Sequence, residues 1–289
     1  MQNKIEYILF LGFSWFIRII GLNNARRISP IFAALFYYLI PIRKKTVIEN
    51  LTFAFPEYNE KKIKKIAFAC YKSFIVTLME ILYLPFTSKE LIHKQVVCDD
   101  KELIIKKYNE GRGVILLSGH YGNWEYIAAS VASQINIPFS VVVKDQRNGY
   151  ITKWMNKFRT QYINKVVPLG ISIRQIYKEL KDKHIVAMVA DQRGPIEGIR
   201  VNFFGRPASV YPGPSLLAIK TGAPVLFGFT VRQKDYTYRV DLHEIDTSDL
   251  TGTDDEKVLE LSRRHTALLE KYIRKHPDHW LWMHKRWKY

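Results

Sequence analysis

From residue 114 onward, short apolar runs alternate with longer stretches in which apolar residues recur at helical spacing. The short runs are rich in β-branched and aromatic residues, which is typical of buried strands. The predicted strands are residues 114–118, 139–143, 184–191, 223–230 and 236–245. The predicted helices among and after them are residues 124–135, 150–163, 172–182 and 254–275. This alternation predicts an α/β fold with a mixed, largely parallel central sheet flanked by helices.

The N-terminal part of the chain follows a different pattern. Residues 7–22 are apolar and aromatic, broken only by Arg18, and residues 28–42 carry no charge. Neither stretch reaches the roughly 20 residues that span a bilayer cleanly. Their aromatic residues and basic flanks favour helices in the interface of an anionic leaflet, although two buried core helices would give the same pattern. We expect residues 1–42 to form a membrane-anchoring segment and residues 43–289 to form the main domain.

Two further helices are predicted between these parts. Residues 59–85 are amphipathic, with Asn59 as a plausible N-cap and Pro85 as the stop. Residues 100–109 form a shorter helical pattern that ends before Gly111.

The composition limits the class of partner. Of the 289 residues, 47% are hydrophobic, which is enough for a sizeable core, and the formal net charge is +17. Such a charge favours anionic partners: nucleic acid, anionic lipid, phosphate groups or an acidic protein. The two cysteines, Cys70 and Cys98, make neither a disulfide framework nor a metal cluster.

Candidate chemistry lies where the predicted strands end. His120 follows the strand 114–118, and Asp191 ends the strand 184–191. Working groups of α/β sheets collect beyond the carboxyl ends of the strands, so both side chains are expected at that edge. Glu125 comes five residues after His120, in the first turn of the next predicted helix, for which Asn123 is the expected N-cap.

The spacing of His120 and Glu125 suggests a base and its orienting carboxylate. If Glu125 reaches back to one imidazole nitrogen, the other nitrogen is free to accept a proton from a substrate hydroxyl. Gly119 and Gly122 would let backbone N–H groups approach an oxyanion. This favours acyl transfer to an alcohol. The alternative is structural: a carboxylate in a first helical turn is favoured by the helix dipole, and His120 would then be an ordinary loop residue.

Four blocks of sequence carry a resemblance to a known family. The stretch "SGHYGNWE" (118–125) resembles the H-x4-D/E motif of glycerolipid and lipid A acyltransferases. Residues 43–57, 191–225 and 276–288 resemble, in order, blocks of the late lipid A enzymes, the last of them reading "HPDHWLWMHKRWK". The chain is therefore similar to the lauroyl/myristoyl-type lipid A biosynthesis acyltransferases.

The resemblance implies a glycerolipid-acyltransferase-like fold and a reaction. A fatty chain would pass from a thioester, usually of acyl carrier protein but alternatively of coenzyme A, to a hydroxyl on a lipid A precursor. His120 would be the general base and Glu125 its orienting group. No metal or other cofactor is implied. The expected partners are acyl carrier protein, anionic inner-membrane lipids and the phosphorylated precursor, without nucleic acid, at the cytoplasmic face of the inner membrane.

Further residues are assigned less directly. Arg159 matches an arginine of the family pattern and is expected, with Arg193, Asp191 and Asn123, to bind substrate or its phosphate. Asp191 would organise the site by holding Arg159 or the loop backbone, or would be an ordinary turn residue. Phe203, Phe204 and Gly205 either line an acyl pocket or pack in the core. Trp280, Trp282 and Trp287, beside Lys285 and Arg286, are expected to form an interfacial or packing cap.

Two other functions remain open from the sequence. The same transfer to a different acceptor, such as an amino-acid-containing lipid, a lysophospholipid or a glycolipid, would leave the same motifs. A basic membrane-associated or nucleic-acid-binding module without catalysis would account for the +17 charge.

Overall fold

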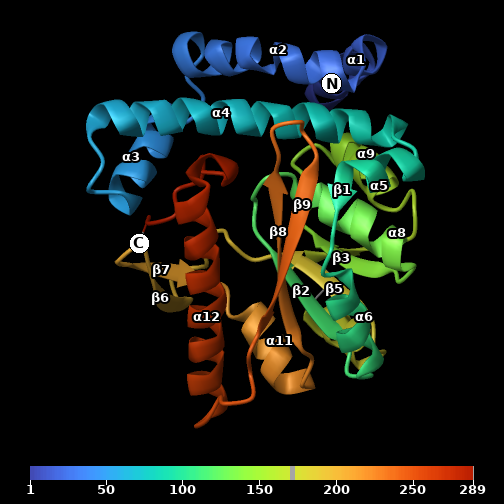
Figure 1. Ribbon diagram of the computed structural model, residues 1–289, viewed down its shortest axis with the longest axis vertical. Coiled ribbons are helices and arrows are strands. Elements are labelled where there is room, and N and C mark those ends of the chain that lie inside the picture. The colour runs from blue at the N-terminus through green and yellow to red at the C-terminus, as the bar shows by residue number, and fades with distance from the viewer. Residues whose placement is uncertain (170–172, 289) are drawn as a thin grey trace.

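A seven-stranded sheet forms the centre of the computed structural model, which describes residues 1–169 and 173–288 (Figure 1). The strand order is β1-β9-β8-β2-β5-β3-β4, and every neighbouring pair is parallel except β8 with β9. The strands are β1 (Val96–Val97), β2 (Val114–Ser118), β3 (Phe139–Val143), β4 (Lys165–Pro168), β5 (Ile185–Val189), β8 (Val225–Arg232) and β9 (Tyr238–Ile245). The predicted mixed, largely parallel sheet is confirmed.

Both faces of the sheet are covered, which explains why its central strands are apolar throughout. In β2, Ile115 and Leu117 pack into one hydrophobic cluster, while Val114 and Leu116 pack into the other. The helices of the first face include α4 (Glu60–Tyr83), α10 (Ile173–Lys181), α11 (Gly213–Thr221) and α12 (Asp254–Lys275). Those of the second face include α5 (Lys89–Gln95), α6 (Lys101–Asn109), α8 (Ala132–Ile135) and α9 (Gly149–Arg159).

Most predicted helices are present with small shifts at their ends. Asn59 caps α4, since its side chain accepts the Lys62 N–H. The predicted helix 124–135 is α7 (Trp124–Tyr126), a π-helical turn (Ile127–Val131) and α8 in succession. The predicted helix 150–163 already ends at Arg159, because the chain turns there toward β4. Residue 172 of the predicted helix 172–182 lies outside the described residues.

A small hairpin was not predicted. Strands β6 (Ile199–Phe203) and β7 (Arg206–Val210) pair antiparallel in a separate two-stranded sheet. They are joined by Phe204 and Gly205, both with positive φ, at 55° and 75°. Such a turn suits a tight hairpin, but the sequence lacks the Asn-Gly or Asp-Gly pair that normally announces one.

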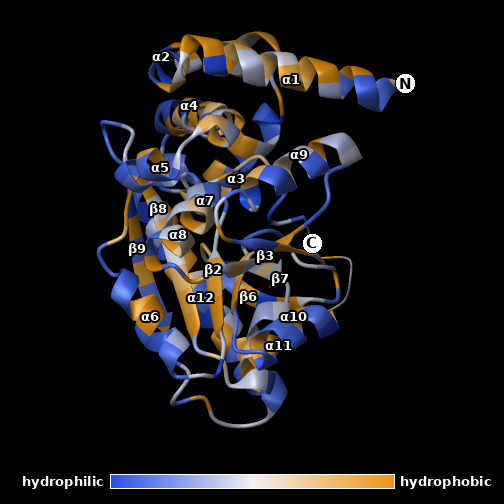
Figure 2. Ribbon diagram, turned by 90° about the vertical axis from the view of Figure 1, so that its right-hand side faces the viewer, coloured by the Kyte–Doolittle hydropathy of each residue, from blue (hydrophilic) through white to orange (hydrophobic). Residues whose placement is uncertain are grey.

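The N-terminal segment forms a helical layer over α4 (Figures 1 and 2). It contains α1 (Gln2–Ile20), α2 (Leu22–Ala34) and a π-helical turn (Leu35–Leu39), followed by α3 (Lys44–Ala54). Ile17, Ala25 and Tyr37 belong to the same hydrophobic cluster as α4 and α12, so packing crosses the expected boundary at residue 42. That boundary, and the anchoring role of residues 1–42, stay predictions.

By length and apolar composition, one helical stretch among the described residues is able to cross a membrane, and it is not in the N-terminal segment. It is Glu60–Phe86, and 61% of its most apolar 18-residue window is buried inside the protein. The outer face of the N-terminal layer is nevertheless apolar, with orange positions along α1 and α2 in Figure 2. Its exposed large apolar residues are Ile5, Ile8, Leu9, Trp15, Phe16, Ile19, Ile31, Tyr38, Leu39, Ile40 and Ile42.

Candidate active site

The register of two parallel strands brings His120 and Asp191 together. Ser118, the last residue of β2, pairs with Val189, the last residue of β5. His120 and Asp191 each follow two residues later, at the same edge of the sheet. Asp191 Oδ1 lies 2.8 Å from His120 Nδ1, and its Oδ2 accepts the His120 backbone N–H at 2.8 Å. The expectation that both residues lie at the carboxyl edge is therefore confirmed.

The carboxylate determines the protonation of the imidazole. Asp191 is 1% exposed and accepts the proton on Nδ1, which leaves the lone pair on Nε2. Burial disfavours the charged ring, but the charge and hydrogen bond of Asp191, together with the charge of Glu125, outweigh it and raise the pKa of His120. Burial also opposes ionisation of Asp191, yet His120 holds the pKa of Asp191 well below its usual value. Nε2 is thus a base with a proton-accepting lone pair.

Glu125 has a different partner from the one expected. Its carboxylate accepts two hydrogen bonds from the Arg159 guanidinium, from Nε at 3.0 Å and from Nη2. The Glu125 and Arg159 side chains are 6% and 12% exposed. The prediction that Glu125 holds the imidazole is therefore wrong. Of the two contacts expected for Asp191, it makes the one with the loop backbone, at the His120 N–H, and not the one with Arg159. The physical reason is the parallel register, which already supplies His120 with a carboxylate, while the first turn of α7 directs Glu125 toward the end of α9.

Asn123 ties the loop after β2 to Glu80 of α4. It stands at the N-cap position of α7, as expected, but its side chain makes no capping bond. Instead, Asn123 Nδ2 donates to Glu80 Oε2 at 3.0 Å, and the residue is 0% exposed. A side chain with no exposed surface does not line the channel in this arrangement, so the binding role expected for Asn123 stays a prediction. The same argument applies to Asp191, whose carboxylate is engaged by the protein.

The glycines of the loop serve packing. Gly122 has a φ of 58°, and a Cβ there would lie 2.0 Å from the Thr230 backbone oxygen. Its N–H donates to the His279 carbonyl at 2.8 Å, so it does not face an oxyanion. A Cβ at Gly119 would lie 3.2 Å from a Leu269 methyl group. Close packing of the loop therefore explains Gly122 better than the expected oxyanion role.

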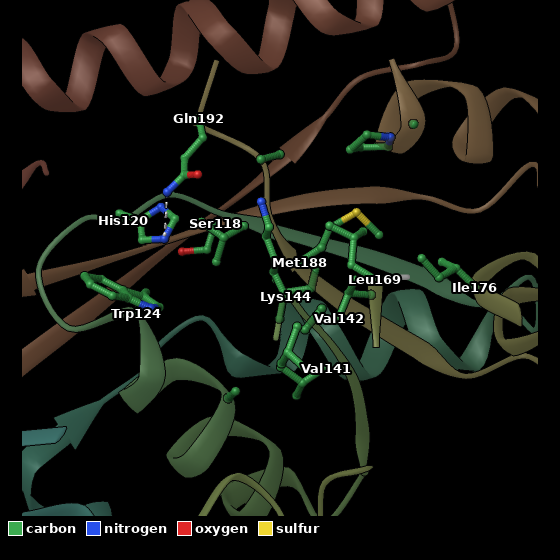
Figure 3. Close-up of a pocket in the computed structure, with 18 of the residues that line it drawn as sticks. Ser118, His120, Trp124, Val141, Val142, Lys144, Leu169, Ile176, Met188 and Gln192 are labelled. Atoms are coloured by element: carbon green, nitrogen blue, oxygen red, sulfur yellow. Dashed lines mark hydrogen bonds between the residues drawn. The ribbon is translucent and has the colours of Figure 1, made fainter. Parts of the chain in front are cut away.

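A cavity of about 540 Å³ opens beside His120 (Figure 3). His120, Ser118 and Gln192 lie at one end, and Val141, Val142, Met188, Leu169 and Ile176 lie along the remainder. Several apolar lining residues are also exposed to solvent, namely Leu169, Ile173, Val189 and Tyr211. The cavity is therefore an open, mostly apolar channel with His120 at its polar end.

Several sequence-predicted residues lie outside this channel. Phe203 and Phe204 are buried and stack among Trp280, Trp282 and Trp287, so of the two alternatives they pack. Arg193 Nη1 donates to the Lys285 carbonyl at 3.4 Å, and its role toward a phosphate stays a prediction.

Two residues of the site were missed. Gln192 Nε2 lies 3.5 Å from His120 Nε2, and Trp280 Nε1 donates to Asp191 Oδ2 at 2.7 Å. The only sequence signal for Gln192 is its place directly after Asp191. Trp280 was predicted as packing or as an interfacial residue, because nothing local indicates a partner 89 residues away.

No group of three or more His, Cys, Asp or Glu side chains in the described part of the chain is arranged to hold a metal ion. The His120–Asp191 pair offers proton transfer at His120 Nε2, next to a mostly apolar channel.

Known proteins share this sequence pattern. The chain is 22% identical over 251 residues to a lipid A biosynthesis palmitoleoyltransferase of Escherichia coli, a match that covers 85% of this chain and 79% of that protein. It is 25% identical over 148 residues to a phosphatidylinositol mannoside acyltransferase of Mycolicibacterium smegmatis, covering 50% of this chain and 48% of the relative. A Mycobacterium tuberculosis protein of the same description is 28% identical over 120 residues, covering 40% and 38%. The chain thus spans about half or less of the mycobacterial relatives that it matches.

The match to a family covers more of the chain than any of these pairs. The sequence profile described as bacterial lipid A biosynthesis acyltransferase matches residues 2–289, which includes all four blocks that carried the resemblance. The chain, with His120 at one end of an apolar channel, belongs to the bacterial lipid A biosynthesis acyltransferase family.

Proposed function

We propose that this protein transfers a fatty acyl chain from an acyl thioester to a hydroxyl of a lipid A precursor, with His120 as general base. The observation that carries the proposal is the His120–Asp191 pair at the polar end of the apolar channel. A base with its lone pair directed to a lipid-sized channel fits O-acylation of a lipid.

The proposed reaction uses the imidazole twice. Nε2 of His120 accepts the proton of the acceptor hydroxyl while the oxygen attacks the thioester carbonyl carbon. The tetrahedral intermediate collapses with cleavage of the carbon–sulfur bond, and the imidazolium returns the proton to the thiolate. An ester and a free thiol are the products. Asp191 keeps the proton of Nδ1 in place and stabilises the imidazolium that forms between the two steps.

The acyl chain of the donor is proposed to occupy the channel. Its lining is contributed by the apolar side chains of β3, β5 and α10, among them Val141, Met188 and Ile176. The thioester carbonyl would then lie at the end where Ser118, His120 and Gln192 meet. Burial of the chain in such a lining contributes about 0.8 kcal/mol per methylene group, which favours long acyl chains.

The Glu125–Arg159 pair is proposed to form the polar wall of the channel opposite Gln192. Both residues line the cavity, and their bidentate bond ties the first turn of α7 to the last turn of α9. Arg159 Nη1 is 3.4 Å from Asn156 Oδ1, a long contact that a phosphate oxygen of the substrate would replace. Arg193 is proposed as the second basic contact for the phosphorylated acceptor.

The donor is proposed to be the thioester of acyl carrier protein. Acyl carrier protein is acidic, and a net charge of +17 steers an acidic protein toward this chain. The same charge attracts the phosphates of the precursor and the anionic lipids of the leaflet, so no nucleic acid is needed to explain it.

The exposed apolar face of α1 and the turn after α2 is proposed to lie in the cytoplasmic leaflet of the inner membrane. Trp15 and Phe16 are 51% and 43% exposed, and Arg18 stacks on Trp15 at 4.5 Å, an arrangement typical of an interface. The same helix packs on α9, where the Phe10 and Trp154 rings lie 4.8 Å apart. Because α9 carries Arg159, a lipid that leaves the membrane there arrives beside the channel.

A second candidate is the same transfer to a different glycolipid. The matches to phosphatidylinositol mannoside acyltransferases favour it, since those relatives are named as acyltransferases that act on a different acceptor. The base and the channel would be used in the same way for either acceptor.

In the test, purified protein in detergent is supplied with the lauroyl and myristoyl thioesters of acyl carrier protein and of coenzyme A. The acceptors are a tetra-acylated, Kdo-bearing lipid A precursor and, separately, a phosphatidylinositol mannoside. Mass spectrometry follows the gain of one acyl chain. Gain on the precursor by the wild type, lost in His120→Ala, supports the proposal. Gain on the mannoside alone supports the second candidate. Transfer that persists in folded His120→Ala overturns the mechanism for either acceptor.

A further inference from the structure

The C-terminal segment 276–288 runs directly along the loop that carries His120. Trp280 forms an isolated antiparallel bridge with Tyr121. On either side of it, the Gly122 N–H donates to the His279 carbonyl at 2.8 Å, and the Leu281 N–H donates to the His120 carbonyl at 3.0 Å. The backbone of the loop is therefore held by a segment that lies about 160 residues later in the sequence.

The indole of Trp280 reaches the carboxylate that orients the base. Trp280 Nε1 donates to Asp191 Oδ2 at 2.7 Å, and the two residues are 2% and 1% exposed. The same oxygen accepts the His120 backbone N–H, and the other oxygen faces His120 Nδ1. Asp191 thus has three donors, and Trp280 is the one that does not belong to His120.

We propose that Trp280 is a positioning residue for the His120–Asp191 pair. Its indole N–H orients the Asp191 carboxylate against the imidazole and weakens the attraction between this carboxylate and the protonated ring. The proposal rests on the proposed function only in that His120 is the general base. It assigns a role in the site to the "HPDHWLWMHKRWK" stretch that packing alone does not give.

The direction of the effect follows from simple electrostatics. The positive end of the indole N–H dipole points at Asp191 and stabilises its negative charge, and it also opposes a second positive charge on the imidazole. Without it, the carboxylate interacts more strongly with the imidazolium, so the pKa of His120 rises further. The base would then be protonated over a wider range of pH.

Other charged groups around the pair keep their places when the indole N–H is removed. From α7 and α9 these are Glu125 and its partner Arg159. The remaining charged or titratable neighbours are Lys144 after β3, Arg193 after β5, and Asp278, His279, His284 and Arg286 of the C-terminal segment. Burial lowers the pKa of His284 to about 4, so this neighbour is neutral at the pH of the assay.

Trp282 provides a matched control on the same segment. It is 1% exposed, like Trp280, and its Nε1 also donates a hydrogen bond, but to the Pro277 carbonyl. Trp282→Phe therefore removes a buried indole hydrogen bond of the same kind without touching Asp191.

The experiment measures the titration of His120 by NMR of the full-length protein with labelled histidine, in wild type, Trp280→Phe and Trp282→Phe. The His120 signal is assigned by its absence in His120→Ala. We expect the pKa of His120 to rise by about half a pH unit in Trp280→Phe and to stay unchanged in Trp282→Phe. The acidic limb of the kcat/KM profile for acyl transfer should move in the same direction. An unchanged pKa in Trp280→Phe, or an equal rise in both variants, overturns the proposal.

Two additions separate the possible failures. If Trp280→Phe does not fold, benzothienylalanine at position 280 keeps the shape of the indole and lacks its N–H, and the same rise in the pKa of His120 is expected. Because the titration needs no substrate, it also separates this proposal from the proposed function. A raised pKa without acyl transfer to any acceptor supports the hydrogen-bond role and overturns the function.

Discussion

Two buried carboxylates hold the same loop from opposite sides. Asp191 holds His120 at the start of the loop, and Glu80 of α4 holds Asn123 at its end. They are 1% and 0% exposed, and each accepts several hydrogen bonds. Glu80 accepts from Arg26 Nε at 2.8 Å, from Asn123, and from the Tyr238 hydroxyl. By burial and by hydrogen bonding, the two carboxylates look alike.

They differ in the cation that each one faces. His120 is titratable, its side chain is 21% exposed, and its second ring nitrogen lies at the channel. Arg26 stays charged at every working pH and is 5% exposed as a side chain. The first pair is thus able to exchange a proton with a substrate, whereas the second pair only holds α2, α4 and the loop together. Access and a titratable partner, rather than burial, distinguish the pair that we propose to be catalytic from the structural one.

The largest expected effect is on catalysis through His120. His120→Ala should lower kcat/KM by about 10²–10⁴-fold, the usual contribution of a general base. Thermal stability should fall to a smaller extent, because the buried Asp191 carboxylate loses the imidazole but still accepts hydrogen bonds from the backbone N–H of residue 120 and from Trp280. The acyl-transfer assay and a melting curve measure both quantities. His184→Ala, which alters a half-buried histidine at the other end of β5, is the control and should retain activity.

The opposite pattern is expected for the structural pair. Glu80→Ala leaves the Arg26 charge buried without its carboxylate, which should cost about 3–5 kcal/mol of unfolding free energy. Urea unfolding measures this, with Glu60→Ala, which breaks an exposed pair with Lys64, as a control expected to cost about 1 kcal/mol or less. The double variant Arg26→Met/Glu80→Leu should be more stable than Glu80→Ala. A Glu80→Ala protein as stable as the wild type would show that this pair does not hold the layers.

The sequence specifies those parts of the fold whose signal is local. The strands 114–118 and 139–143 have the predicted bounds, because each is a short apolar run buried on both faces. Asn59 and the capping box of α12 mark helix ends through bonds to residues three positions away. The β6–β7 hairpin was not predicted because Phe204 in its turn adopts a positive φ, which is uncommon for an aromatic residue.

The candidate site shows where local patterns are insufficient. His120 was identifiable as a polar residue at the end of an apolar strand, next to a glycine and a carboxylate. The carboxylate that orients it lies 71 residues away, and only the pairing of Ser118 with Val189 brings it into place. Glu125 is closer in sequence, but its position on α7 directs it to Arg159. Sequence spacing therefore finds the base, while the sheet order selects its partner.

A pair of substitutions tests which carboxylate orients the base. Asp191→Asn removes the charge and offers an amide to Nδ1, which should reduce kcat/KM by on the order of 10²-fold or more and lower the pKa of His120. Glu125→Gln leaves the bond between His120 and Asp191 intact and should reduce kcat/KM less. The two variants are compared by kinetics and by titration of His120. If kcat/KM falls more in Glu125→Gln than in Asp191→Asn, then Glu125, and not Asp191, is the residue that orients His120.

The smallest effect expected is a divergence of activity and stability with pH. Because the pKa of folded His120 is raised above its ordinary value of 6.5, kcat/KM should increase up to about tenfold per pH unit between 6.5 and the folded pKa, as Nε2 loses its proton. The ion pair with Asp191 contributes stability that is fully present below the unfolded pKa and is lost as pH rises through the folded pKa. In this window activity should therefore rise while the unfolding free energy falls.

The four histidines with a lowered pKa do not obscure this divergence, because their protons leave at lower pH. Burial lowers the pKa of both His265 and His284 to about 4, and it lowers the pKa of His93 and His276 as well. Kinetics and urea unfolding at closely spaced pH values above 6.5 measure the two trends. Asp191→Asn should flatten both, because it removes the charge that raises the pKa of His120, whereas Glu80→Gln should leave the pH of the activity rise in place. An unfolding free energy that rises with activity through this window would mean that the imidazolium is not paired with Asp191 in the folded protein.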